Sequence, residues 1–193
     1  MIFKISRCWQ ALFALTCLGS LRAQQTINLG LNIHEESLSN NAARSGIGVS
    51  FQKEMQKHLA LETGLFIGRV SYPYSVTSDR GTVSVNINES HLTIPILYEF
   101  QTKWINIGIG PALDFLIGPR PLPFNVDGNM ITPLAAPGFD LRLWCKVKIP
   151  IKLGDVFTLE PEGRINRSFS IDQTGIGMGI NLRYRLSPFI ALN

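Results

Sequence analysis

The chain has 193 residues, of which 45% are hydrophobic and 17% are charged, and this suits a single domain with a sizeable core. Its 17 Gly and 11 Pro are spread without a period, which excludes collagen-like repeats and low-complexity disorder. No stretch reaches about 18 uninterrupted apolar residues, so the sequence predicts no membrane-spanning helix.

The first 23 residues have the layout of a secretory signal peptide. Two basic residues stand near the start, a mostly apolar segment follows at 8–18, and small residues lead up to Ala23. The apolar segment is too short to span a bilayer, which is typical of a signal that is removed after export. We therefore expect a signal peptide at 1–23, cleavage near Ala23, and an exported domain at 24–193.

Removal of this segment changes the charge and the cysteine count. Lys4, Arg7 and Arg22 are lost, which leaves 15 Lys and Arg against 14 Asp and Glu. A net charge of +1 provides no basic excess for nucleic acid, so no such partner is expected. Cys145 is then the only cysteine, no Cys/His group has the spacing of a zinc site, and we expect no metal or other cofactor.

The remaining sequence alternates apolar and polar residues with a period of two, which is typical of β-strands with two different faces. Eight strands are predicted, at 26–33, 46–55, 59–68, 91–100, 105–115, 139–149, 157–165 and 176–186. Most are about 9–12 residues long, whereas an average globular strand has ~5–6 and a membrane-spanning strand needs ~9–11. The strand lengths therefore favour a membrane β-barrel.

The predicted connections alternate in length. Long ones lie at 34–44, 71–90 and 116–137, short ones at 56–57, 101–103 and 150–155, and a moderate one at 170–173. In an antiparallel up-and-down array, every second connection lies at the same end, so all long loops share one end. With an even number of strands, this asymmetry is typical of an outer-membrane barrel. The predicted fold is therefore all-β, an eight-stranded antiparallel up-and-down transmembrane β-barrel.

The polar face of these strands carries charges of both signs. Eight strands leave an interior only wide enough for side chains, so these charges can pair across it. We therefore expect a charge network in the lumen, made of Glu62, Glu99, Asp114, Asp140, Arg142, Glu160, Glu162, Arg164, Arg183 and Arg185.

The apolar face carries aromatic residues near the strand ends, as girdles at two membrane interfaces would. They are Phe100, Trp104 and Phe157 beside the short turns, and Tyr72, Phe115, Phe139 and Phe169 beside the long loops. Three features fit less well. Pro95, Pro111 and Pro161 fall inside strands, where bulges could absorb them. Trp144 falls on the polar face, and Lys53, Arg69 and Arg167 fall on the apolar face, where charge is tolerated only near an interface.

Several motifs resemble the PorT-like outer-membrane β-barrel family of Bacteroidetes-type bacteria. They are Ala-Gln at 23–24, HLTIPILYEF at 91–100, INIGIGPALDFLIG at 105–118 and GIGMGINLRYRL at 175–186, and the resemblance covers most of 24–186. It implies an eight-stranded outer-membrane barrel, and a few members of the family are linked to secretion machinery or serve larger envelope assemblies. The chain departs from the family at its end, because it continues past Tyr184 to Asn193 where many such barrels finish on an aromatic residue.

No arrangement of residues points to catalysis. Ser90 and His91 could belong to a hydrolase, but adjacent residues of a strand point to opposite faces. Glu160 and Glu162 share a face as glycosidase acids do, but the nearby arginines favour a salt network. We predict no catalytic residue.

The sequence thus predicts a non-enzymatic outer-membrane barrel, a scaffold or accessory component of an envelope assembly such as one that serves secretion. Its wall would contact outer-membrane lipid, and its loops 71–90 and 116–137 would contact an envelope protein. Two alternatives remain open. One is an outer-membrane lipid-modifying hydrolase, and the other is a soluble periplasmic lipocalin-like binder with its two faces reversed.

Overall fold

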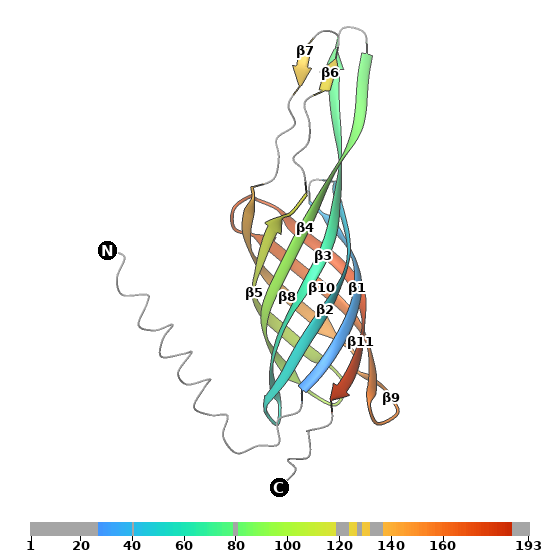
Figure 1. Ribbon diagram of the computed structural model, residues 1–193, viewed down its shortest axis with the longest axis vertical. Helices are drawn as coiled ribbons and strands as arrows, with labels where there is room; N and C mark the ends of the chain where they lie inside the picture. The colour runs from blue at the N-terminus through green and yellow to red at the C-terminus, as the bar shows by residue number, and fades with distance from the viewer. Residues whose placement is uncertain are drawn as a thin grey trace, which may run out of the picture.

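The computed structural model describes residues 27–39, 41–78, 81–118, 124–126, 129–131 and 137–186, and these form β-strands joined by turns (Figure 1). The strands are β1 (Ile27–Leu38), β2 (Ala43–Gln56), β3 (Leu59–Ser78), β4 (Gly81–Gln101), β5 (Asn106–Leu116), β6 (Phe124–Val126), β7 (Asn129–Ile131), β8 (Phe139–Lys148), β9 (Ile151–Leu153), β10 (Phe157–Ser168) and β11 (Thr174–Leu186). Within these ranges, no helix has the length and apolar character needed to cross a membrane. The predicted signal peptide and its cleavage site lie outside the described residues.

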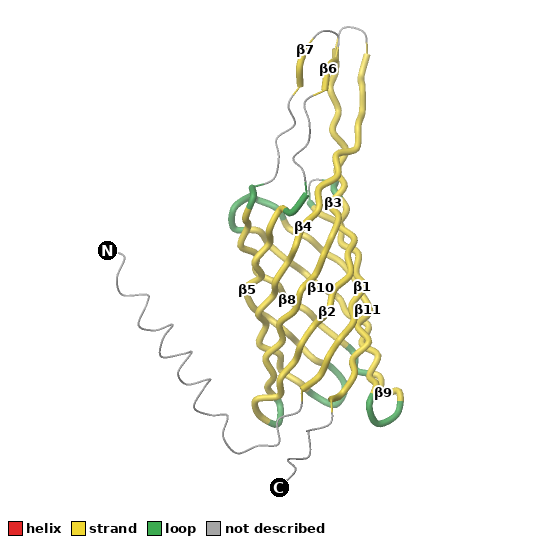
Figure 2. The backbone as a smooth tube through the Cα atoms, in the orientation of Figure 1, coloured by secondary structure: helices red, strands yellow, loops and turns green. Residues whose placement is uncertain are grey.

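Eight of the strands close into one antiparallel barrel (Figure 2). Their order around the barrel is β1-β2-β3-β4-β5-β8-β10-β11, and β11 returns to β1 through a ladder that runs from Ile27↔Leu186 to Leu38↔Gly175. The short β9 pairs with the start of β10, and β6 and β7 form a separate hairpin. Closure pairs the edges that an open sheet would leave exposed, as a strand in lipid requires. The predicted eight-stranded up-and-down barrel is confirmed.

The two faces of the barrel are those of a membrane protein. Ile107 and Ile180 are 42% and 54% exposed on the outer wall, whereas Glu62 and Arg183 are 1% and 7% exposed inside. A barrel in water would bury its aliphatic side chains and solvate its charges. The apolar wall therefore faces lipid, and the lipocalin-like alternative is wrong because it requires the opposite arrangement.

The connection predicted at 34–44 is much shorter in the structure. β1 continues to Leu38 and β2 begins at Ala43, because His34 and Glu36 keep the period of two and point inward, where both are buried. Polar residues in this segment favour a loop when the sequence is considered alone. In a membrane barrel, however, the inward face of a strand is itself polar, so these residues belong to the strand.

The connection predicted as a long loop at 71–90 is also largely strand. The β3–β4 ladder runs on from Ser71↔Asn88 to Ser78↔Gly81, so this segment is a hairpin that projects beyond the barrel (Figure 1). β-branched and aromatic residues continue through it, and they favour paired strand over loop. The predicted loop at 116–137 is described only in part and includes β6 and β7.

The prolines need no bulge where the β4–β5 register can be followed. Pro95 pairs with Ala112, and Tyr98 pairs with Ile109 in the same register. The ladder is therefore interrupted only between these two pairs, where Pro111 lies on β5, and it resumes without a shift. The shift that does occur lies between β2 and β3, at Glu54 and Gln56 beside the turn.

Candidate functional site: the charged interior and the projecting hairpin

Nine of the ten residues proposed for the lumen network point into the barrel and are buried. Arg185 does not, because it lies near the end of β11, where its side chain is 56% exposed and its nearest carboxylate, on Glu54, is 4.0 Å away. The expectation that Arg185 joins the interior network is therefore wrong. The other nine lie in three clusters, one above another along the barrel axis.

The cluster nearest the projecting hairpin is centred on Asp114. One carboxylate oxygen, Oδ2, lies 2.7 Å from Arg44 Nη2 and 3.0 Å from Arg142 Nε. The other accepts a hydrogen bond of 2.8 Å from the Thr93 hydroxyl. Arg142 also lies 2.9 Å from Asp140, so the two acids and two arginines join three strands, β2, β5 and β8, and Thr93 adds β4.

The middle cluster is centred on Arg164. Its guanidinium lies 3.3 Å from Glu36 Oε1, donates a 3.1 Å hydrogen bond to Asn32, and contacts the carboxylate of Glu162. Asn166 donates to the second oxygen of Glu36 at 3.0 Å. Residues more than 120 positions apart in the chain meet here because β10 and β1 both flank β11.

Two aromatic side chains fill the centre of the barrel beside this cluster. The rings of Phe66 and Trp144 meet edge to face, with their centroids 5.9 Å apart. Lys146 Nζ lies 5.0 Å from the Phe66 centroid, and the Arg164 guanidinium carbon lies 5.0 Å from the Trp144 centroid. Cations at this distance are attracted to the faces of aromatic rings. Trp144 thus points inward as its parity indicates, without a bulge.

The third cluster lies toward the short turns and is centred on Lys148. Its ammonium contacts Glu62 and lies 2.5 Å from Glu99 Oε2. Arg183 lies 2.8 Å from Glu160 Oε2, which also accepts a 2.8 Å hydrogen bond from Asn181. Lys146, 3.1 Å from Glu62 and 3.9 Å from Glu162, links this cluster to the middle one.

Sequence reasoning missed several of the residues that complete these clusters. Glu36 and Arg44 fall in the loop predicted at 34–44, although the alternation 32, 34, 36 and the spacing to Gly46 and Gly48 place both on the inward face. Tyr72, expected in an outer girdle, instead follows Val70 on the inward face. Its hydroxyl donates a 3.0 Å hydrogen bond to Glu89.

The projecting hairpin has two chemically different faces. On one face the cross-strand neighbours are Tyr72 with Ile87 and Tyr74 with Val85. The other face includes pairs of hydroxyl residues, with Ser75 Oγ 2.8 Å from Ser84 Oγ and Thr77 Oγ1 3.2 Å from Thr82 Oγ1. Beside the barrel, β2 pairs with β3 only as far as Ser71. Above that level, no described strand continues the ladder on the β3 side of the hairpin.

The residues considered for chemistry are not brought together. His91 is buried in the interior, while Ser90 lies half-buried on the outer face. Glu160 and Glu162 each contact a cation, as described above. Among the described residues, no group of three or more His, Cys, Asp or Glu side chains is placed to hold a metal ion.

Solved structures show the same architecture at low sequence identity. The outer-membrane protein OprG from Pseudomonas aeruginosa matches with a TM-score of 0.52 and 9% identity, over 87% of this chain and 98% of that chain. Neisserial surface protein A matches with a TM-score of 0.45 and 11% identity, over 85% and 98%. Ail, the attachment invasion locus protein of Yersinia pestis, matches with a TM-score of 0.45 and 10% identity, over 84% and 97%.

No protein-family model matches the sequence, and no curated protein matches it. The similarity to OprG supports the β-barrel fold. The resemblance to the PorT-like family remains a prediction from the sequence motifs.

Proposed function

We propose that the protein is a non-enzymatic outer-membrane β-barrel that serves as an accessory or scaffold component of an envelope assembly. In this proposal, residues 1–23 direct export and are removed near Ala23, and the barrel anchors the chain in lipid. The projecting hairpin, helped by the segment at 116–137, then contacts a protein partner. The observation that carries the proposal is the continuous β3–β4 ladder from Ser71↔Asn88 to Ser78↔Gly81, beyond the level where neighbouring strands stop.

The buried interior supports an anchoring role rather than transport. Ion pairs cross the lumen in three clusters, and the Phe66 and Trp144 rings lie between them. Charges buried in this way hold one geometry, because the loss of any partner leaves another charge uncompensated. We propose that the nine interior residues of the predicted set form a structural network that keeps the barrel rigid and closed.

The hairpin is suited to contact with protein. Among the described strands, none pairs with β3 beyond Ser71, and a strand edge of this kind can accept an added strand from a partner through main-chain hydrogen bonds. Its Tyr and Val residues provide alternate side chains that could be recognised on one face. We propose strand addition at the β3 side of the hairpin, between Tyr72 and Ser78, as the mode of contact.

Site-specific photo-crosslinking in intact cells tests this proposal. A photoreactive amino acid at Ser75 or Ser84 is expected to give one protein adduct of defined mass. The same group at Ile107 on the lipid-facing wall is expected to give none. Replacement of 73–86 by an Asn-Gly turn keeps the Tyr72↔Ile87 pair, and in this variant we expect adducts from the segment at 116–137 to be reduced as well.

The barrel itself is the internal control. The shortened variant should still migrate faster on a gel before heating than after it, as a folded barrel does. Absence of an adduct from both hairpin positions, in cells where the barrel is folded, would contradict the proposed partner. Porin-like ion conductance in planar bilayers would contradict the closed lumen.

A further inference from the structure

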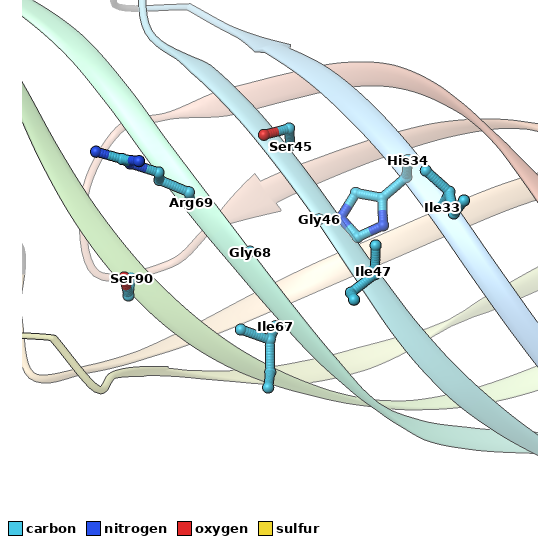
Figure 3. Close-up of a pocket in the computed structure, with 9 residues that line it drawn as sticks. All are labelled: Ile33, His34, Ser45, Gly46, Ile47, Ile67, Gly68, Arg69 and Ser90. Carbon is cyan, nitrogen blue, oxygen red and sulfur yellow. The ribbon is translucent and has the colours of Figure 1, made fainter.

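A hollow in the outer wall lies across four strands at the level where the hairpin leaves the barrel. Its volume is about 330 Å³, and it is lined by residues of β1, β2, β3 and β4 (Figure 3). This hollow is separate from the buried interior clusters, because most of its lining side chains belong to the lipid-facing surface.

The polar part of the hollow contains an arginine between two serines. Arg69 is exposed on the outer face, and its cross-strand neighbours are Ser45 on β2 and Ser90 on β4. Among the described residues, no carboxylate lies within 4.0 Å of its guanidinium, whereas Arg167, also exposed on the outer wall, lies 3.0 Å from Asp172. Arg69 is therefore a cation on a lipid-facing surface without an ion-pair partner within the described chain.

The apolar part lies one step along the strands, toward the middle of the barrel. Ile33, Ile47 and Ile67 are direct neighbours across β1, β2 and β3, and all three are exposed. The hollow thus has a positive charge and hydroxyl groups near the rim, and aliphatic groups toward the middle of the wall. A lipid with a charged headgroup and acyl chains has its polar and apolar parts in the same order.

We propose that this hollow binds a phosphorylated lipid of the leaflet that surrounds the hairpin end of the barrel. Arg69 would hold the phosphate through two parallel N–H···O bonds, which a guanidinium can donate to phosphate oxygens. The hydroxyls of Ser45 and Ser90 would donate to the same group. The acyl chains would lie on Ile33, Ile47 and Ile67. This inference does not depend on the protein partner proposed above.

Glu35 gives the site an internal test. It is exposed on β1 and is the cross-strand neighbour of Ser45, on the side away from Arg69. Its negative charge opposes a phosphate in the hollow. Removal of that charge in Glu35→Gln is therefore expected to strengthen lipid binding, whereas loss of Arg69 weakens it.

Native mass spectrometry of the delipidated, folded barrel in detergent measures this binding. The barrel is titrated with diphosphoryl lipid A, with phosphatidylcholine and with inorganic phosphate. We expect lipid A to bind most tightly and Arg69→Gln to weaken it about tenfold, which corresponds to the loss of one charge-assisted contact. Arg69→Lys should give an intermediate value, and Arg167→Gln, the matched control, should bind as the unaltered protein does.

Three results would overturn the proposal. The first is equal lipid A affinity in the unaltered protein and Arg69→Gln. The second is an equal loss in Arg167→Gln. The third is binding of inorganic phosphate as tight as that of lipid A, which would indicate an anion site without a role for the acyl chains. If Arg69→Gln does not fold, the double variant Ser45→Ala/Ser90→Ala provides a second measurement. Its lipid A affinity should also fall, but by less than the loss expected for Arg69→Gln.

Discussion

Replacement of Lys148 by Met is expected to destabilise the barrel strongly. The Lys148 ammonium is fully buried and lies between the carboxylates of Glu62 and Glu99. Met fills a similar volume but leaves these two negative charges facing each other without the cation between them. Loss of one partner of a buried ion pair costs ~3–5 kcal/mol, and Lys146 and Arg183 near Glu62 compensate only in part.

Urea unfolding in detergent micelles, followed by the change in gel migration, measures this effect. The matched control is the surface ion pair between Arg167 and Asp172, which has an N–O distance of 3.0 Å but exposed side chains. Arg167→Met removes the same kind of contact from an exposed position, where such pairs contribute at most about 1 kcal/mol. We therefore expect the interior variant to lose several times more stability than the surface variant.

The double variant Lys148→Met/Glu62→Gln distinguishes the ion pair from simple packing. Because it removes one of the two uncompensated carboxylates together with the cation, part of the lost stability should return. If Lys148→Met unfolds at the same urea concentration as Arg167→Met, the interior charges are hydrated and the account of a closed lumen is refuted.

Four further substitutions, one of them a control, test other parts of the structure by the same unfolding measurement. Trp144→Ala removes the largest fully buried side chain among the described residues and should cost ~3–5 kcal/mol, and an unchanged unfolding midpoint would contradict the packed centre. Gly110→Ala should destabilise because its Cβ would lie 2.1 Å from the Ile96 carbonyl oxygen, whereas Gly163→Ala, with no atom within 4 Å, should not. Ile107→Lys places a charge on the lipid-facing wall and should cost ~2–4 kcal/mol if that position lies near the middle of the bilayer, and full stability there would argue against lipid contact.

Much of the fold could be predicted because a closed barrel repeats one rule around its circumference. The period of two places Glu62, Arg142 and Trp144 inside and Ile107 outside, and each position follows from parity alone. Strand count and antiparallel order follow from the same alternation. Parity also places Tyr72 and Glu36 on the inward face, but the polar residues near the rim resemble those of a loop and so predict strand ends that come too early.

The contacts inside the lumen could not be predicted in the same way. Parity shows that Arg164 and Glu36 both point inward, but it does not show that they meet across 128 positions of sequence. That pairing depends on the register with which β11 closes onto β1 and on the stagger of the whole ring. The exposed position of Arg185 likewise depends on where β11 reaches the rim, and the composition of a strand does not specify this point.

The central claim is that the aliphatic side chains of the wall contact lipid while the polar and charged side chains are enclosed. Paramagnetic broadening of methyl signals in lipid nanodiscs tests it without any substitution. A nitroxide on the lipid acyl chain should broaden the methyl signals of Ile107 and Ile180, which are exposed, and spare that of Leu97, which is fully buried inside. Broadening of Ile107 and Ile180 by a water-soluble gadolinium chelate, with no effect of the acyl-chain nitroxide, would contradict the account.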